Sequence, residues 1–424
     1  MNKPMFSRSI GPFVLLGLVA SAQGCNRCST KDPKADAAPP LPSAISVAKE
    51  DLLPPPAPWT FKPARLGPGM PSFALPQGCT LREPTVHASV AASTKFVATS
   101  LGLGTLVVAD ADPKETPPKL VGVAGVLLDP QGASKEPAAL PWTDAAAMPR
   151  IARSKTGSWF AAFTHTADEQ PSEVFVYQNN KITSLGEGDR FDAVDMLCGN
   201  TRCALLTTRK GNVLALGASV VVGSPDEPVA SWKNFEITPS AGDSNVRPSI
   251  LAAVDPKVIV AMIEGQELVF FEAESSPAGR EIGRVQAPHG IIDATMTDAP
   301  LALVYGAEVD DEGCAREGGK IHISRPGKEP IEIRAHAPPT SGSLRTLAQG
   351  TLATYLAPLG CGQPRKVVYA VVLDPAGSPV SAPMPIADAQ SYAAASDGEN
   401  VDIWIQLEDD VTWLRARCAT PSPH

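Results

Sequence analysis

The sequence predicts an all-β fold, a β-propeller of about seven four-stranded blades, and three observations lead to it. From Cys79 onward, short strands and polar turns recur in units of about 49 residues. The first strand of each unit is rich in small residues, as expected next to a crowded central axis. No amphipathic helix competes with the strands. Six or eight blades also fit the pattern.

The first 24 residues predict a signal peptide. Lys3 and Arg8 give a positive start, and Ile10 to Ala22 is an apolar stretch of 13 residues. A bilayer-spanning helix needs about 20 residues, so this stretch fits a secretory segment better than an anchor helix. The stretch ends in Ala22-Gln23-Gly24-Cys25.

That ending resembles the lipobox of bacterial lipoproteins, in which a small residue precedes a Cys that becomes the acylated N-terminus. The resemblance covers the first 25 residues and implies lipidation of Cys25 and a secreted, membrane-anchored protein, periplasmic or at the cell surface. It departs from the family at Ala22, where Leu is usual, and at Gln23. Asn26 replaces the Asp that retains some lipoproteins at the inner membrane, which favours the outer membrane. An ordinary signal peptide cleaved near Ala22 or Gly24 is the alternative.

Residues 25–70 predict a lipid-anchored tether rich in Pro and Ala. Twelve prolines lie between residues 26 and 78, with no sustained hydrophobic period. Such a composition cannot bury enough apolar surface to fold and gives an extended spacer. A Pro-rich ligand for a partner's groove is the alternative. The propeller domain then covers residues 71–424.

The elements of the repeat follow in a fixed order. Small first strands are expected to begin at Ala88, Ile151, Ala193, Leu251, Ala294, Leu347 and Ala393. After a polar turn, apolar second strands begin at Phe96, Trp159, Cys203, Val258, Leu301, Leu352 and Val401. Third strands begin at Leu106, Glu173, Asn212, Glu267, Lys320, Lys366 and Val411. Weaker fourth strands begin at Leu120, Ile182, Phe235, Glu281, Ile331 and Val380.

The last unit ends at Cys418 without a fourth strand. A propeller must close its ring, and a strand from the N-terminal side of the domain is a common way to complete the last blade. Pro71 to Leu75 is placed to supply that strand.

The repeat alignment predicts three disulfides, which an oxidising compartment would allow. Cys198 and Cys203 flank one tight turn, Cys314 and Cys361 lie in loops of neighbouring units on one face, and Cys79 and Cys418 bracket the ring closure. Cys28 is left over. Thiol ligation of a metal is the alternative, but the body of the domain has no Cys-x-x-Cys pair.

The sequence predicts no catalytic residue, cofactor or metal site. It contains none of the common nucleophile, zinc, phosphate-loop or dinucleotide motifs. The net charge of −9 argues against nucleic-acid binding, which needs clustered Lys and Arg.

A candidate binding face is predicted where the long loops between second and third strands and between units gather. Its residues are Trp142, His165, Glu312, Arg316 and Arg365. The alternative is that long loops are tolerated at that face without any role in binding.

These observations favour a cell-envelope lipoprotein whose propeller binds or scaffolds a protein, peptide or glycan partner and is not an enzyme. The alternative is a propeller hydrolase or lyase that acts on envelope or extracellular polymers. The fold alone does not choose between them, but two carboxylates about 5 to 9 Å apart in the channel mouth would favour the enzyme.

Overall fold

The described part of the chain is a ring of β-sheets. The computed structural model describes residues 61–63, 79–81, 85–88, 96–99, 102–108, 120–128, 134–140, 150–165, 173–178, 181–187, 190–210, 216–237, 246–275, 279–307, 319–335, 337–347, 350–358, 365–380, 382–407 and 410–418. All of them belong to one compact unit, Leu41–His424. The predicted signal peptide, Cys25 and Cys28 lie outside the described residues.

Six sheets have four antiparallel strands each. Three of them are β4–β7 (Phe96–Thr99, Gly102–Val108, Leu120–Leu128, Ser134–Leu140), β8–β11 (Arg150–Arg153, Trp159–His165, Glu173–Gln178, Lys181–Glu187) and β12–β15 (Arg190–Cys198, Cys203–Lys210, Leu216–Gly223, Lys233–Ile237). The others are β16–β19 (Val246–Ala253, Ile259–Glu264, Glu267–Glu272, Arg280–Gln286), β20–β23 (Ile291–Met296, Pro300–Tyr305, Gly319–Ser324, Ile331–Ala335) and β24–β27 (Ser341–Leu347, Gly350–Pro358, Lys366–Leu373, Met384–Asp388).

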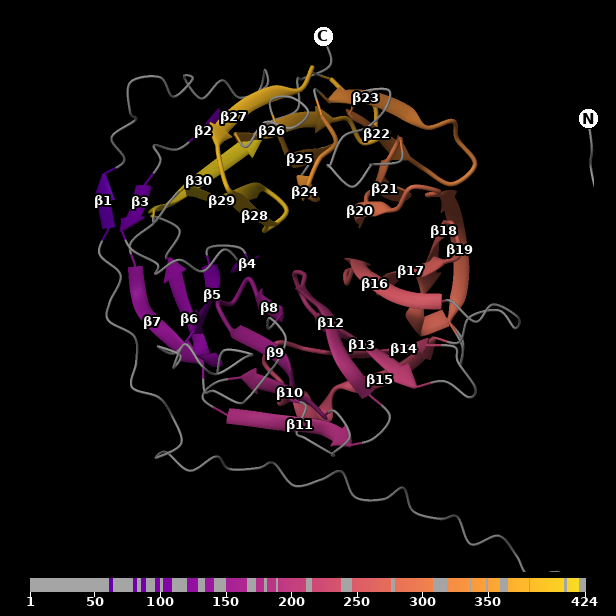
Figure 1. Cartoon of the computed structure of the whole chain (residues 1–424). Coiled ribbons are helices and arrows are strands. Elements are labelled where there is room, and N and C mark those ends of the chain that lie inside the picture. The colour runs from indigo at the N-terminus through magenta and orange to yellow at the C-terminus, as the bar shows by residue number, and fades with distance from the viewer. Residues whose placement is uncertain are drawn as a thin grey trace, which may run out of the picture. The chain divides into compact units, whose positions relative to one another are not determined.

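A seventh sheet of six strands completes the ring. From the axis outward its first three strands are β28, β29 and β30 (Ser391–Ser396, Asn400–Leu407, Asp410–Cys418), and β2 (Cys79–Leu81) and β3 (Thr85–Ala88) both pair with β30. The strand β1 (Phe61–Pro63) pairs with β3, so part of the predicted tether adds a strand to the body. The innermost strands β4, β8, β12, β16, β20, β24 and β28 each contact the next, and β28 contacts β4 (Figure 1). The predicted propeller is confirmed.

The N-terminal side of the domain supplies the outer strand that the last blade lacks, as predicted. The strands that do so are β2 and β3, and the expected segment Pro71–Leu75 lies outside the described residues. In this pairing Cys79 lies directly opposite Cys418.

Several strand boundaries differ from the prediction. The segment Phe96–Thr99, expected as a second strand, is the innermost strand β4, because Ser134–Leu140 forms a fourth strand in what was expected to be a connector. The strand β14 begins at Leu216 rather than Asn212. The innermost strand β24 ends at Leu347 instead of beginning there, and β27 begins at Met384 rather than Val380.

The core consists of layers between successive sheets. Each of the five hydrophobic clusters formed by the described residues draws side chains from two neighbouring sheets; one of them joins Leu206 and Val220 to Val260 and Val269. Second strands are covered on both faces, and eight of the nine residues of β25 are buried. The outer strand β19 is more exposed, with four of its seven residues on the surface. Face-to-face packing of sheets therefore holds the ring together.

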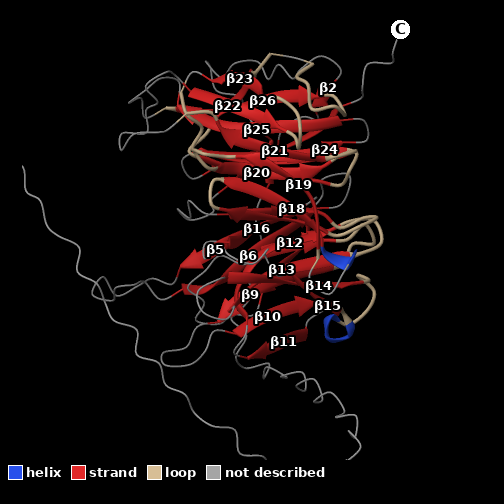
Figure 2. Ribbon diagram, turned by 90° about the vertical axis from the view of Figure 1, so that its right-hand side faces the viewer, coloured by secondary structure: helices blue, strands red, loops and turns tan. Residues whose placement is uncertain are grey.

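Seen from the side, the strands lie in stacked layers with loops at their ends (Figure 2). The helical turns among the described residues are η2 (Val229–Ser231) and η3 (Ala273–Ser275). Among the described residues there is no helix with the length and apolar character needed to cross a membrane.

Candidate ligand-binding cavity

A cavity of about 1090 Å3 lies along the ring axis and is lined by all seven innermost strands. Exposed residues at its rim come from the turns between first and second strands: Lys155, Asn200 and Glu399. The cavity therefore opens at the face that carries those turns. Its size is that of an ordinary small-ligand site.

Charged side chains of both signs project from these strands. Asp293 on β20 accepts hydrogen bonds from its neighbour Ala294 N–H at 2.9 Å and from Leu344 N–H, in the next sheet, at 2.7 Å. The guanidinium of Arg345 pairs with the same carboxylate at 2.7 Å and also donates to Ala394 O at 2.7 Å. This ion pair therefore joins three successive sheets, β20–β23, β24–β27 and the closing sheet.

Asp195 on β12 repeats this arrangement two sheets earlier. Its carboxylate accepts hydrogen bonds from Met196 N–H at 2.9 Å and, across the sheet boundary, from Leu251 N–H at 2.8 Å. Burial raises the pKa of Asp195, although the Leu251 N–H and the charge of Arg150 act in the opposite direction. Asp195 forms no ion pair with any described residue.

Arg150 begins β8, the innermost strand of the sheet before Asp195, and it lines the cavity. Its Nε is buried and has no hydrogen-bond partner. Burial of an unsatisfied guanidinium N–H is costly. Arg150 and Asp195 are therefore two opposite charges in one cavity, near enough for one to affect the pKa of the other.

Tyr392 on β28 also lines the cavity. Its hydroxyl donates to Thr354 O at 2.8 Å, and the hydroxyls of Thr354 and Ser343 lie 2.7 Å apart. Burial raises the pKa of Tyr392 to about 12. The phenol therefore stays neutral and holds β28 against the preceding sheet.

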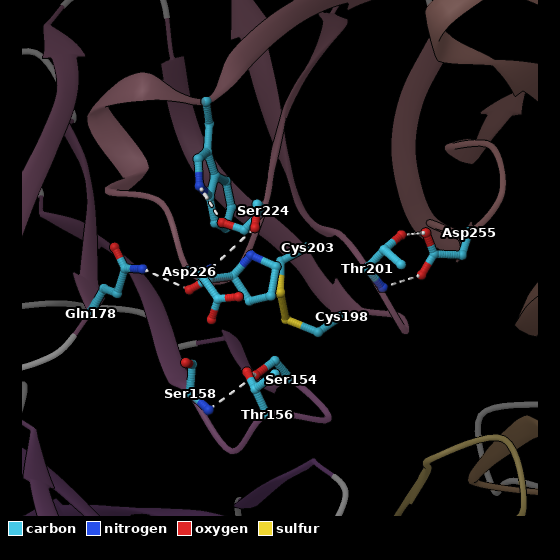
Figure 3. The surroundings of a disulfide bond; sticks show 12 residues. Ser154, Thr156, Ser158, Gln178, Cys198, Thr201, Cys203, Ser224, Asp226 and Asp255 are labelled. Atoms are coloured by element: carbon cyan, nitrogen blue, oxygen red, sulfur yellow. Dashed lines mark hydrogen bonds between the residues drawn. A yellow bond between two sulfur atoms is a disulfide. The ribbon is translucent and has the colours of Figure 1, made fainter.

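The predicted disulfide between Cys198 and Cys203 is present at the rim (Figure 3). It joins the end of β12 to the start of β13 across a turn that carries Thr201 and Arg202. Thr201 donates to Asp255 of the next sheet through its hydroxyl at 2.7 Å and through its N–H at 3.0 Å.

Arg202 extends the same contact. Its guanidinium donates to Val254 O at 2.7 Å, Pro256 O at 2.5 Å and Glu274 Oε1 at 2.6 Å. Burial alone would raise the pKa of Asp255, but the hydrogen bonds from Thr201 and the charge of Arg202 outweigh it and lower that pKa. We call Thr201, Arg202, Asp255 and Glu274 the turn clamp.

The structure describes little of the predicted binding face. Trp142, Glu312, Arg316, Cys314 and Cys361 lie outside the described residues. His165 ends β9 and Arg365 directly precedes β26, in sheets that do not adjoin. Arg365 is exposed and binds Asp388 in its own sheet with two hydrogen bonds of 2.9 and 2.7 Å. The opposite face, expected to carry only tight turns, also bears η2 and η3.

The cavity residues Arg150, Asp195, Asp293 and Arg345 were not predicted from the sequence. A detectable signal was present at Asp293, which is the single charged residue of the first strand β20. The emphasis on small residues near the axis hid it. Within the described residues, no group of three or more His, Cys, Asp or Glu side chains is arranged to hold a metal ion.

No protein-family model matches this sequence, and no curated protein matches it. Solved structures do resemble it in fold. The β-propeller domain of the Trilobed protease from Pyrococcus furiosus has 12% identity and a TM-score of 0.43, covering 77% of this chain and 95% of that one. The β-propeller domain of Cps50 (Swd1) from Myceliophteria thermophila has 9% identity and a TM-score of 0.43, covering 79% and 99%. A soluble aldose sugar dehydrogenase from Escherichia coli has 10% identity and a TM-score of 0.33, covering 60% and 94%.

Proposed function

We propose that this protein is a lipid-anchored binding protein of the cell envelope and that its propeller captures a ligand or partner at the central cavity without transforming it. The lipobox-like ending at Cys25 supports the anchor, and the Pro-rich segment after it supports a spacer. The net negative charge of the chain argues against a nucleic-acid ligand and is compatible with a protein, a peptide or a glycan.

One observation carries the preference for binding over catalysis. The carboxylates of Asp195 and Asp293 each accept one N–H from their own strand and one from the next sheet. A general acid or nucleophile needs a free carboxyl oxygen directed at the reacting bond. Both carboxylates instead hold neighbouring sheets in register.

The alternative is a hydrolase or lyase, and the raised pKa of Asp195 favours it. A cavity that raises the pKa of a carboxyl group is how a general acid is tuned. Hydrolysis of envelope polysaccharides or peptides that disappears in Asp195→Asn, while the variant keeps its fold, would establish the enzyme.

The proposal is tested by recovering the protein from its own envelope with the anchor intact, after mild crosslinking. We expect one stoichiometric partner, a membrane-bound parent protein and release of Cys25→Ser into the soluble fraction. Recovery of the bare protein under conditions that crosslink known neighbours would overturn the stable-partner function. A membrane-bound Cys25→Ser would overturn the lipid anchor.

A further inference from the structure

The central cavity holds two ionisable side chains, Arg150 and Asp195, to which the described residues offer no ion-pair partner within salt-bridge distance. Arg150 has a buried Nε with no acceptor, and no hydrogen bond or ion pair of the described residues involves its guanidinium. From the described residues, each carboxyl oxygen of Asp195 accepts one backbone N–H, which leaves each oxygen a second lone pair for the amine of a ligand. The two come from adjacent innermost strands, β8 and β12, and both line the cavity.

The equivalent site two sheets later shows how this chain satisfies such a pair when it is structural. Asp293 bonds Leu344 N–H, and the next residue, Arg345, closes an ion pair at 2.7 Å. Asp195 bonds Leu251 N–H in the same way, but the next residue there is Ala252. The repeat thus keeps the carboxylate, but Ala252 stands where the other site has the arginine that closes the ion pair.

We propose that the cavity binds a small zwitterion, with the carboxylate of the ligand on Arg150 and its protonated amine on Asp195. Free amino acids are the smallest molecules of this class. The proposal rests on the binding function proposed above and names the ligand of that same site.

Charge balance selects this class over simpler ligands. A plain anion would satisfy Arg150 but repel Asp195, and a plain cation would do the reverse. An uncharged ligand would exclude water from both groups and pair neither. A zwitterion pairs both at once, and a cavity of about 1090 Å3 leaves room for its side chain.

The experiment uses the full chain without its signal peptide and screens the common amino acids by thermal shift, then measures Kd by calorimetry. The best binder is compared with its analogues that lack either the amine or the carboxylate, for example phenylalanine with 3-phenylpropionate and phenethylamine. We expect removal of either charge to weaken binding about tenfold or more.

Variants assign each half of the site. Arg150→Gln should weaken the amino acid about tenfold or more and leave the affinity for the amine analogue unchanged. Asp195→Asn should weaken the amino acid and not the carboxylate analogue. Lys181→Gln and Asp192→Asn are the matched controls, because both residues are exposed, lie on β11 and β12, and do not line the cavity.

Three results would overturn the proposal: no amino acid binds, the analogue without the amine binds as tightly as the amino acid, or Arg150→Gln binds like the parent. If Asp195→Asn does not fold, the analogue series and Arg150→Gln still decide. If these binding tests fail but an envelope partner is crosslinked, the zwitterionic ligand is wrong and the proposed binding function stands.

Discussion

Gln178 is a single buried side chain that joins two sheets. It lies at the end of β10, and its amide donates to Pro225 O at 3.2 Å and to Glu227 O at 2.9 Å. Its carbonyl accepts Val229 N–H at 3.1 Å. All three partners belong to the loop between β14 and β15 of the next sheet.

Replacing Gln178 with Leu should lower the free energy of unfolding by about 1–3 kcal/mol, because buried backbone groups of that loop lose their partners. Chemical denaturation of the two proteins measures the difference. Gln266→Ala is the control, since Gln266 is exposed in the turn between β17 and β18. Equal losses in both variants would contradict the role given to Gln178.

The ion pair of Arg345 should contribute more to the free energy of unfolding than the ion pair of Arg365. Arg345→Met leaves the buried carboxylate of Asp293, which is 8% exposed, without its cation, and we expect a loss of about 3 kcal/mol. Arg365→Met breaks an exposed pair with Asp388 and should cost clearly less, because solvent screens that pair. Urea unfolding of both variants tests the ranking, and a reversed order would refute it.

Asp195 should make stability depend on pH. The unfolded carboxyl titrates at about 3.9. In the folded protein burial raises the pKa of Asp195, the charge of Asp293 adds to this, and the Leu251 N–H and the charges of Arg150 and Arg345 oppose it. Protonated Asp195 therefore contributes its full share to the free energy of unfolding when the pH is below the pKa of the unfolded carboxyl. That contribution is lost as the pH rises through the pKa of Asp195 in the folded protein. Relative to the parent, Asp195→Asn should gain stability between acid and neutral pH in thermal unfolding. Asp192→Asn, on the same strand but exposed, is the control.

At the scale of the strand, the disulfide and the turn clamp should act as one unit. The bridge closes a short loop, which in the chain-entropy model is worth about 2 kcal/mol. It also fixes the turn from which Thr201 and Arg202 reach the next sheet. A double-mutant cycle of Cys198→Ala/Cys203→Ala with Asp255→Asn should therefore show a coupling of about 1 kcal/mol. Additive losses would show that the bridge and the clamp are independent.

Strand order could be predicted from the sequence because turn residues and apolar runs repeat in register. The strands of β16–β19 were predicted well, since tight turns such as Asp255-Pro256 separate continuous apolar segments. The strand β7 was missed because it contains Pro137, which usually argues against a strand but is tolerated at the outer edge of a sheet. The start of β24 was missed because Ser341, Ser343 and Arg345 make it read as a loop.

The rim disulfide was predictable because Cys198 and Cys203 directly flank one turn. The cavity charges were not, because their meaning depends on which strands meet across the axis. Asp293 and Arg345 lie 52 positions apart in the chain and become partners only when two sheets pack. A single sequence lists the residues of such a site but does not show which of them lie side by side in the folded protein.

At the scale of the whole molecule, ring closure should depend on β2 and β3. Removal of residues 1–60 keeps every described strand, and we expect a single cooperative unfolding transition to remain. Removal of residues 1–95 leaves the outer edge of β30 unpaired and uncovers Trp413, which is fully buried opposite Thr85. That variant should lose the cooperative transition in calorimetry.

Ring closure should also involve a disulfide. Peptide mapping of the unreduced protein should link Cys79 to Cys418, which lie opposite each other in the pairing of β2 with β30.

The pairing of β2 with β30 also sets the timing of folding. Thr80 donates to Arg417 O across 337 positions of chain, so the strand β2 has to wait for the last strand of the chain, β30, before the two can pair. While the chain emerges from the ribosome or crosses a membrane, the inner sheets can form one after another but the ring stays open at a seam. An open seam exposes strand edges that pair readily with other chains. The interval between synthesis of the first and last strands is therefore the period in which this protein is most exposed to aggregation and most dependent on chaperones.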